Sequence, residues 1–390
     1  MTERGLQLGR IFGIQIHLDW SWFFIFVLIT WNLASVFGEA HPEWDIVLRG
    51  GTAVIAALLF FASVLAHELA HSIVARAHGV PVRHITLMLF GGVANIQREP
   101  PSPKAEFLIT IVGPITSILL GFFFILMAGI TASINMEMVQ EPTAVIAQLG
   151  PVPTLLLWLG PINLLLGVFN LIPGFPLDGG RILRSTLWAI TDNLQQATRW
   201  AAGVGQIISL LLIVAGISMI FGATIPLLGS GFINGLWLAF IGWFLNNAAV
   251  QSYRQVVIED VLEGVPIANL MRTNPPTVSA DITISTLVYE YIMNRDDHAF
   301  PVEVDGELVG LVTLEDVRAI GREQWDITYV REVMTPNNRL ATLPATAEAD
   351  EALHQLSQLD VSQMPVVENG RLVGLIRRRD IMKWLQLQGA

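Results

Sequence analysis

Residues 53–74 read AVIAALLFFASVLAHELAHSIV, and this stretch decides the fold. It is apolar over its first two thirds and matches the roughly 20 residues that a helix needs to cross a bilayer. Its ionisable side chains, His67, Glu68 and His71, all lie near its end. Ionisable groups at membrane depth are costly and usually functional. The stretch therefore predicts a transmembrane helix with a functional site at one end.

Five further apolar stretches are long enough to cross a membrane. They are residues 20–37, 107–134, 155–172, 204–221 and 225–244. Hydrophobic residues make up 53% of the chain and charged residues only 14%, whereas soluble proteins carry about 25% charged residues. We therefore expect a polytopic α-helical membrane domain of about six spans, embedded in a lipid bilayer.

The basic residues predict how these spans are oriented. Lys and Arg gather in the N-terminal arm and in the second and fourth connections, at Arg4, Arg10, Arg76, Arg83, Arg98, Lys104, Arg181, Arg184 and Arg199. The other connections hold only Arg49, at the edge of a span. By the positive-inside rule, both termini face the cytoplasm of a multi-pass plasma-membrane protein.

Residues 67–71, His-Glu-Leu-Ala-His, match the pattern H-E-x-x-H. Residues four apart on a helix share one face, so both imidazoles can bind one Zn²⁺ with Glu68 beside the open coordination position. The metal would lower the pKa of a bound water toward about 7. Glu68 would accept the proton of this water and pass it to the leaving amine. A solvated surface helix is the alternative, but the motif ends an apolar run.

Asp178 is the best candidate for a third zinc ligand, which a catalytic site needs besides its water. It follows the fourth span, which crosses the membrane in the same direction as the second, so both groups reach the same face. The sequence around Asp178, Leu-Asp-Gly-Gly-Arg over residues 177–181, also suits a simple turn before a helix, and this alternative stays open. The chain has no cysteine, so any zinc must use histidine and carboxylate ligands.

The two motifs together resemble the signatures of the site-2 protease family of intramembrane metalloproteases. Residues 67–71 match the first signature and residues 170–181, NLIPGFPLDGGR, match the second. The resemblance covers about residues 8–250. It implies a zinc metalloendopeptidase that cuts membrane-spanning proteins, such as membrane-tethered regulators, by regulated intramembrane proteolysis.

The resemblance also implies roles for particular residues. His67, His71 and Asp178 would be the zinc ligands, and Glu68 the general base. Asn170 would contact the substrate or its oxyanion, as an amide donor can. An asparagine that bonds the end of its own helix is an equally weighted alternative.

Gly91, Gly92 and Val93 match a sheet-like segment that lies near the active site in this family. A helical substrate hides its peptide bonds in its own hydrogen bonds, so it must be unwound and held extended before hydrolysis. Pairing with an exposed strand edge would do this. An ordinary short hairpin without a substrate role is the alternative.

The C-terminal third is a tandem repeat of about 64 residues. Residues 299–302, AFPV, align with 363–366, QMPV, and residues 306–312, GELVGLV, align with 370–376, GRLVGLI. Short strands alternate with helices in each copy, which predicts two α/β modules. They resemble a pair of cystathionine-beta-synthase (CBS) domains.

Such pairs often dimerise and often bind ATP or another adenine nucleotide. The motif G-h-h-T/S-x-x-D holds the ribose, which assigns Thr313 and Asp316 in the first copy and Asp380 in the second. The second copy departs from the motif at Arg377, which puts its ribose site in doubt, although its run of arginines could meet phosphates. A structural or dimerising module without ligand is the alternative.

These patterns define four regions. They are a protease domain over residues 1–250, a linker over 251–262, and CBS domains over 263–325 and 326–390. The segment after residue 252 holds 21 acidic and 12 basic residues, so a nucleic-acid partner is not expected. The competing function is a CBS-gated transporter or channel. That alternative predicts repeated sets of spans, and none is seen between the first and last three.

Overall fold

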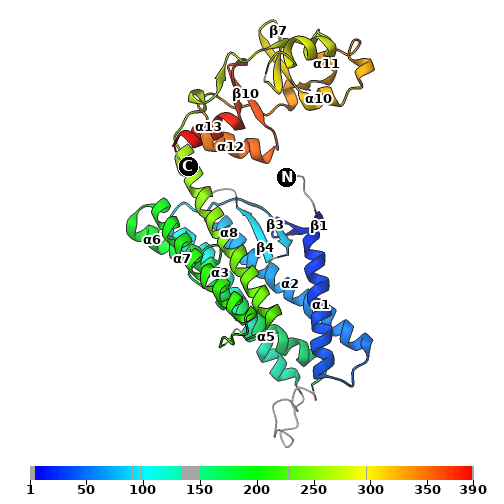
Figure 1. The fold of residues 1–390 in the computed structure, drawn as a ribbon, viewed down its shortest axis with the longest axis vertical. Coiled ribbons are helices and arrows are strands. Elements are labelled where there is room, and N and C mark those ends of the chain that lie inside the picture. The colour runs from blue at the N-terminus through cyan, green and yellow to red at the C-terminus, as the bar shows by residue number, and fades with distance from the viewer. Residues whose placement is uncertain are drawn as a thin grey trace, which may run out of the picture. The chain divides into compact units, whose positions relative to one another are not determined.

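The computed structural model describes residues 5–89, 91–96, 99–132, 149–226, 229–295 and 297–388. The chain forms two compact units, residues 2–253 and residues 254–390, and Figure 1 shows the helical first unit and the α/β second unit.

Six helices in the described residues are long and apolar enough to cross a membrane. They are α1 (Trp20–Ala40), α2 (Ile46–Ala77), α3 (Pro103–Thr131), α5 (Pro151–Asn170), α7 (Leu194–Ile220) and α8 (Phe232–Leu262). Many of their apolar side chains lie on the outer surface, as expected for helices that face lipid. The predicted class, a six-span helical domain followed by an α/β domain, is confirmed.

The boundaries differ most at the last span. The expected stretch 225–244 begins too early, because Gly229 and Gly231 have positive φ angles and a β-bridge joins Ile225 to Gly229 before α8 begins. Residues 251–262, expected as a linker, continue α8 as helix. Residues 133 and 134 of the third expected span lie outside the described residues.

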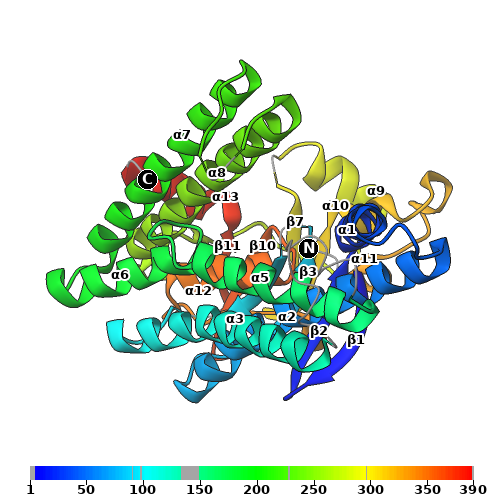
Figure 2. The same cartoon turned by 90° about the horizontal axis from the view of Figure 1, so that it is seen from below.

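Helices α3 and α5 pack closely, and Figure 2 shows them side by side. A methyl group added at Gly160 would lie 2.4 Å from Ile125, and one added at Gly121 would lie 2.7 Å from Leu164. Small residues at such contacts let transmembrane helices approach each other. This contact fixes the position of α3, which forms one wall of the candidate site.

The first unit also holds a four-stranded sheet in the order β1 (Gly5–Ile11), β2 (Ile14–Asp19), β3 (Val82–Met88) and β4 (Gly91–Ile96). Strands β2 and β3 are parallel, and β4 pairs only with β3. Ile16 and Ile85 pack against Ala75 of α2 and Ile109 of α3. The sheet is thereby fixed to the helices, and β4 is one of its edges.

The second unit contains two interlocked α/β modules. One sheet has the order β6 (Val278–Ser279), β7 (Ala299–Val304), β8 (Glu307–Thr313) and β9 (Thr335–Pro336), and the other β10 (Gln363–Glu368), β11 (Arg371–Arg377) and β5 (Arg272–Thr273). The helices are α9 (Ile284–Thr286), α10 (Leu314–Arg318), α11 (Val330–Val333), α12 (Ala349–Gln358) and α13 (Arg378–Gln388). Strand β5 lies within residues 263–325, expected as the first module, but pairs with β11 of the second, so neither module is independent of the other.

Candidate metal and catalytic site

Two segments far apart in the sequence bring three possible metal ligands together. Helix α2 carries His67 and His71 one turn apart, and Asp178 begins α6 (Asp178–Thr191). The Oδ2 atom of Asp178 lies 3.1 Å from Nε2 of His67 and 3.2 Å from Nε2 of His71, and the two Nε2 atoms are 3.1 Å apart. The site forms where α3 packs against both α2 and α6.

The spacing of these three atoms fits zinc. Ligands about 2.0–2.1 Å from a tetrahedral zinc ion lie about 3.3 Å apart, close to the distances seen here. Nδ1 of His71 lies 2.7 Å from the carbonyl oxygen of Ile109, which can only accept, so a neutral His71 presents a lone pair at Nε2. Two lone pairs and a carboxylate oxygen then face one centre, an arrangement that a cation stabilises.

The outer nitrogens of both imidazoles are held by α3. Nδ1 of His67 lies 2.9 Å from the Ser117 hydroxyl, and Nδ1 of His71 donates to Ile109. Metal-binding histidines commonly use such outer hydrogen bonds to fix the ring and its tautomer. Gly113 lies between these two positions, and a methyl group added there would be 2.1 Å from Nε2 of His71. Only glycine leaves room for the imidazoles.

The two glycines after Asp178 fold the start of α6 onto the loop before it. Added methyl groups would lie 2.3 Å from the Ile172 carbonyl oxygen at Gly179 and 2.3 Å from the Phe175 nitrogen at Gly180. Both contacts are with backbone, so neither position tolerates a side chain. The turn, one of the two predicted alternatives for this motif, is therefore present, and it places the Asp178 carboxylate beside the two histidines.

A buried ion pair ties α6 to α3 beyond Asp178. Arg184 donates from Nε to Glu106 Oε1 at 2.7 Å and from Nη2 to Glu99 Oε2 at 2.8 Å. Arg184 is 3% exposed and Glu106 is fully buried. Burial raises the pKa of Asp178, whereas positive charge on the facing imidazoles, that of His71 most, lowers it, and the pKa of this carboxyl lies below its ordinary value when the imidazoles are protonated.

Glu68 lies beside these groups and against strand β4. A methyl group added at Gly92 would lie 2.4 Å from Cγ of Glu68 and 3.0 Å from its Cδ. The edge strand therefore runs directly past the side chain predicted to move protons. Val93, the next residue, is 52% exposed, which leaves this part of the strand accessible.

Asn170 is the last residue of α5, and its side-chain amide donates to the Leu166 carbonyl at 3.0 Å. This bond is consistent with the helix-end alternative, and the substrate role of Asn170 stays a prediction. In the second unit, Thr313 and Asp316 bond each other at 2.8 Å and cap α10. Asp380 instead receives two hydrogen bonds from Arg377, at 2.6 and 2.8 Å.

Ser117, Gly113 and Glu106 belong to the surroundings of the site but were not predicted. All three lie on α3, inside a stretch that the sequence marks only as a membrane span. Glu106 was the available signal, because it is an acidic residue at the start of an apolar run. Ser117 and Gly113 have no such signal, since small residues are common in transmembrane helices.

Comparisons with known proteins match both units. The sequence profile of peptidase family M50 matches residues 55–215, and that of the CBS domain matches 267–322 and 330–387. Zinc metalloprotease Rip3 of Mycobacterium tuberculosis is 33% identical over 98% of this chain and 93% of its own length. Zinc metalloprotease sll0528 of Synechocystis is 33% identical over the whole of this chain and 97% of its own.

Among solved structures, the site-2 protease from Methanocaldococcus jannaschii is similar to the first part of the chain. It shares 28% identity, covers 64% of this chain and 95% of its own, and has a TM-score of 0.41.

Proposed function

We propose that this chain, which belongs to the site-2 protease family of zinc metalloproteases (peptidase family M50) and carries a CBS pair, hydrolyses membrane-spanning proteins at the site formed by α2 and α6. The family acts on membrane proteins within the bilayer, and the six long apolar helices fit an integral membrane protein. The single observation that supports this site most is the convergence of His67, His71 and Asp178 on one point.

These three residues would hold the zinc ion, and Glu68 would be the general base. The bound metal supplies an activated water and polarises the scissile carbonyl. Glu68 follows His67 on α2, and its side chain lies against Gly92 of β4. Its carboxylate accepts a proton and returns it to the leaving amine, a role worth about 10²–10⁴-fold in rate. Asn170 is proposed to turn its amide to the substrate from the end of α5.

Strand β4 is proposed to hold the substrate. Its outer edge has no partner strand in the described sheet, and Gly92 contacts Glu68. A substrate segment that adds to this edge becomes extended and passes the general base. Gly91 and Gly92 leave the backbone uncovered, and Val93 offers an apolar contact.

The orientation and the regulation of the enzyme are also proposals. The distribution of Lys and Arg supports cytoplasmic termini and a cytoplasmic CBS pair in the plasma membrane. Adenine nucleotides would bind the first CBS module through Thr313 and Asp316, with Asp380 as the matching position of the second. Nucleotide binding, and dimerisation through the CBS pair, would shift the protease between conformations that differ in access for substrates.

A comparison of membranes tests the proteolytic function. Cells that produce the parent protein are compared with cells that produce Glu68→Gln, and membrane proteins are followed by quantitative proteomics. Single-span substrates should persist with the variant and be shortened by the parent. Identical membrane proteomes from two equally abundant, zinc-loaded proteins would contradict the proposal.

A second pair of variants tests the role of β4. Val93→Pro removes a backbone donor from the strand, whereas Val93→Ala keeps it. Val93→Pro should lose cleavage of the substrates found above and retain zinc, and Val93→Ala should cleave them. Normal cleavage by Val93→Pro would assign the hairpin a purely structural role.

A further inference from the structure

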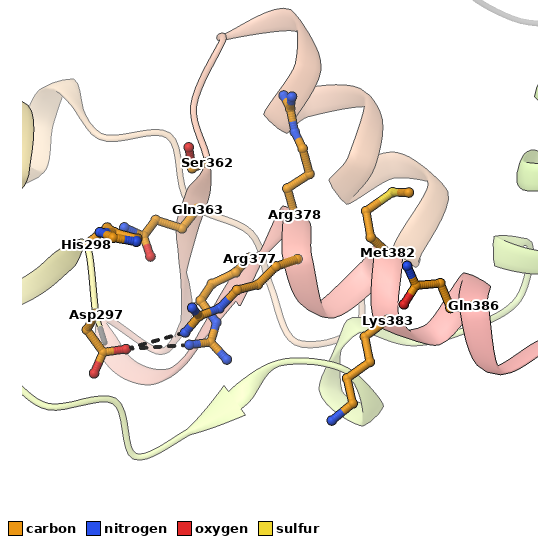
Figure 3. A pocket seen from close by; sticks show the side chains of 10 residues that line it. Asp297, His298, Ser362, Gln363, Arg377, Arg378, Met382, Lys383 and Gln386 are labelled. Atoms are coloured by element: carbon orange, nitrogen blue, oxygen red, sulfur yellow. Dashed lines mark ion pairs between the residues drawn. The ribbon is translucent and has the colours of Figure 1, made fainter. Parts of the chain in front are cut away.

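A cavity of about 540 Å³ lies between the two CBS modules. One wall is formed by Asp297 and His298, just before β7 of the first module, and the other by the start of β10, the end of β11 and α13 of the second. Figure 3 shows these side chains around the cavity.

The charge of the cavity is opposite to that of its surroundings. The chain after residue 252 is acidic, with 21 acidic and 12 basic residues. The described residues that line the cavity nevertheless include four basic side chains, Arg377, Arg378, Arg379 and Lys383, and one acidic side chain, Asp297. A concave surface of one charge focuses the field and attracts ions of the opposite sign. The ligand expected here is an anion.

The second module cannot hold a ribose as the first can. Arg377 donates to both carboxylate oxygens of Asp380, from Nε at 2.6 Å and from Nη2 at 2.8 Å. Such a two-pronged pair is among the strongest side-chain interactions. A ribose hydroxyl would have to break it to reach Asp380. In the first module, Thr313 stands where the second has Arg377, and the described residues show no ion pair to Asp316.

Asp297 lies within ion-pair distance of three arginines at this cavity. It is 8% exposed, and its Oδ1 lies 2.5 Å from Nη1 of Arg272. Nη1 of Arg377 and Nη2 of Arg379 are farther from the same oxygen, at 3.5 and 3.7 Å, and Figure 3 marks both ion pairs. These two distances exceed the 2.7–2.9 Å of charge-assisted hydrogen bonds. An incoming anion can therefore engage both arginines while Arg272 still neutralises Asp297.

We infer that this cavity binds a compact polyanion of two or more linked phosphates and does not select for ribose. Arg379 and Lys383 lie one turn apart on α13, separated by about 6 Å along the helix axis. Linked phosphates can offer a separate phosphate group to Arg377 and to the cations of α13, whereas a single phosphate would have to share its oxygens among all of them. The inference deepens the ligand-binding part of the proposed function and rests on it, but its test does not require proteolysis.

Calorimetry on the purified full-length chain tests this site, with inorganic pyrophosphate, orthophosphate and adenosine as probes. The test variant is Arg379→Gln/Lys383→Gln. The matched control is Arg339→Gln/Arg371→Gln, which removes two exposed charges of the same unit that do not line the cavity. About one pyrophosphate should bind per chain, with at least tenfold weaker binding in the test variant and less than a twofold change in the control. Orthophosphate should bind at least tenfold more weakly than pyrophosphate.

A further variant tests the loss of ribose selection. Arg377→Thr should weaken pyrophosphate binding at least tenfold and create a site for adenosine, because it frees Asp380. The inference is overturned if the folded parent protein shows no heat of pyrophosphate binding, or if the test and control variants lose binding equally. Pyrophosphate binding without any effect on proteolysis would leave the site standing and refute the proposed regulation.

Discussion

Gly113→Ala should destroy the metal site although it touches no proposed ligand. The new methyl group would lie 2.1 Å from Nε2 of His71 and 2.8 Å from Nε2 of His67. Ordinary contacts begin near 3.4 Å, so His71 would have to move by about 1.3 Å. The imidazoles cannot swing away freely, because hydrogen bonds to Ile109 and Ser117 hold their outer nitrogens.

The expected loss is large. Displacements of about 1 Å can cost about 10²-fold in catalysis, and disturbance of groups that orient metal ligands costs about 10–100-fold in metal affinity. We therefore expect zinc affinity to fall by about 100-fold or more in Gly113→Ala. The assay is zinc content by elemental analysis, with affinity measured by competition against a chelator.

The matched control is Gly129→Ala on the same helix, where an added methyl group meets nothing within 4 Å. Replacing glycine by alanine inside a helix by itself stabilises the helix by about 0.5–1 kcal/mol. A loss of zinc therefore cannot be explained by destabilisation of helix α3. Equal zinc affinity in Gly113→Ala, Gly129→Ala and the parent would refute the geometry of the site.

Three further predictions follow from the surroundings of the site. Gly92→Ala should lower the rate of substrate cleavage at least tenfold while zinc is retained, because its methyl group would lie 2.4 Å from Cγ of Glu68. A normal cleavage rate would show that Glu68 does not lie against β4 in the active enzyme. Arg184→Met should lower the free energy of unfolding by up to about 3–5 kcal/mol, because buried Glu106 then faces Arg181 alone among its described ion-pair partners, at 3.6 Å. Thermal melting should show the double variant Arg184→Met/Glu106→Met to be less impaired. Removal of zinc by a chelator should lower the melting temperature, since zinc at 100 times its dissociation constant stabilises the fold by about 2.7 kcal/mol. An unchanged melting curve after complete removal of zinc would argue against a site built from three ligands.

The sequence predicts the spans and the grouping of His67, His71 and Asp178 well because both depend on strong local signals. An apolar run longer than about 20 residues has few alternatives, and two histidines at helical spacing point to one face regardless of the tertiary structure. Asp178 was found through topology, since the alternating basic connections put it on the same side of the membrane as His67. The structure then adds the distances that a sequence cannot give.

What the sequence could not predict depends on contacts between helices. Gly113 and Ser117 matter only because α3 packs against α2 at one particular depth, and no local pattern specifies that depth. The start of α8 was misplaced by the apolar residues 225–231, where glycines with positive φ delay the helix. The sequence motif also showed that Arg377 replaces the usual Thr or Ser. It could not show that this arginine pairs with Asp380.

Zinc content of the purified protein tests the central claim most directly. The parent should hold about one zinc per chain, His67→Ala and Asp178→Ala should lose most or all of it, and Glu68→Gln should keep it. His78→Ala, a histidine near the end of α2 that bonds the Val74 carbonyl instead, is the matched control and should also keep its zinc. Zinc that stays bound in both ligand variants, or a folded parent that binds none, would contradict the account.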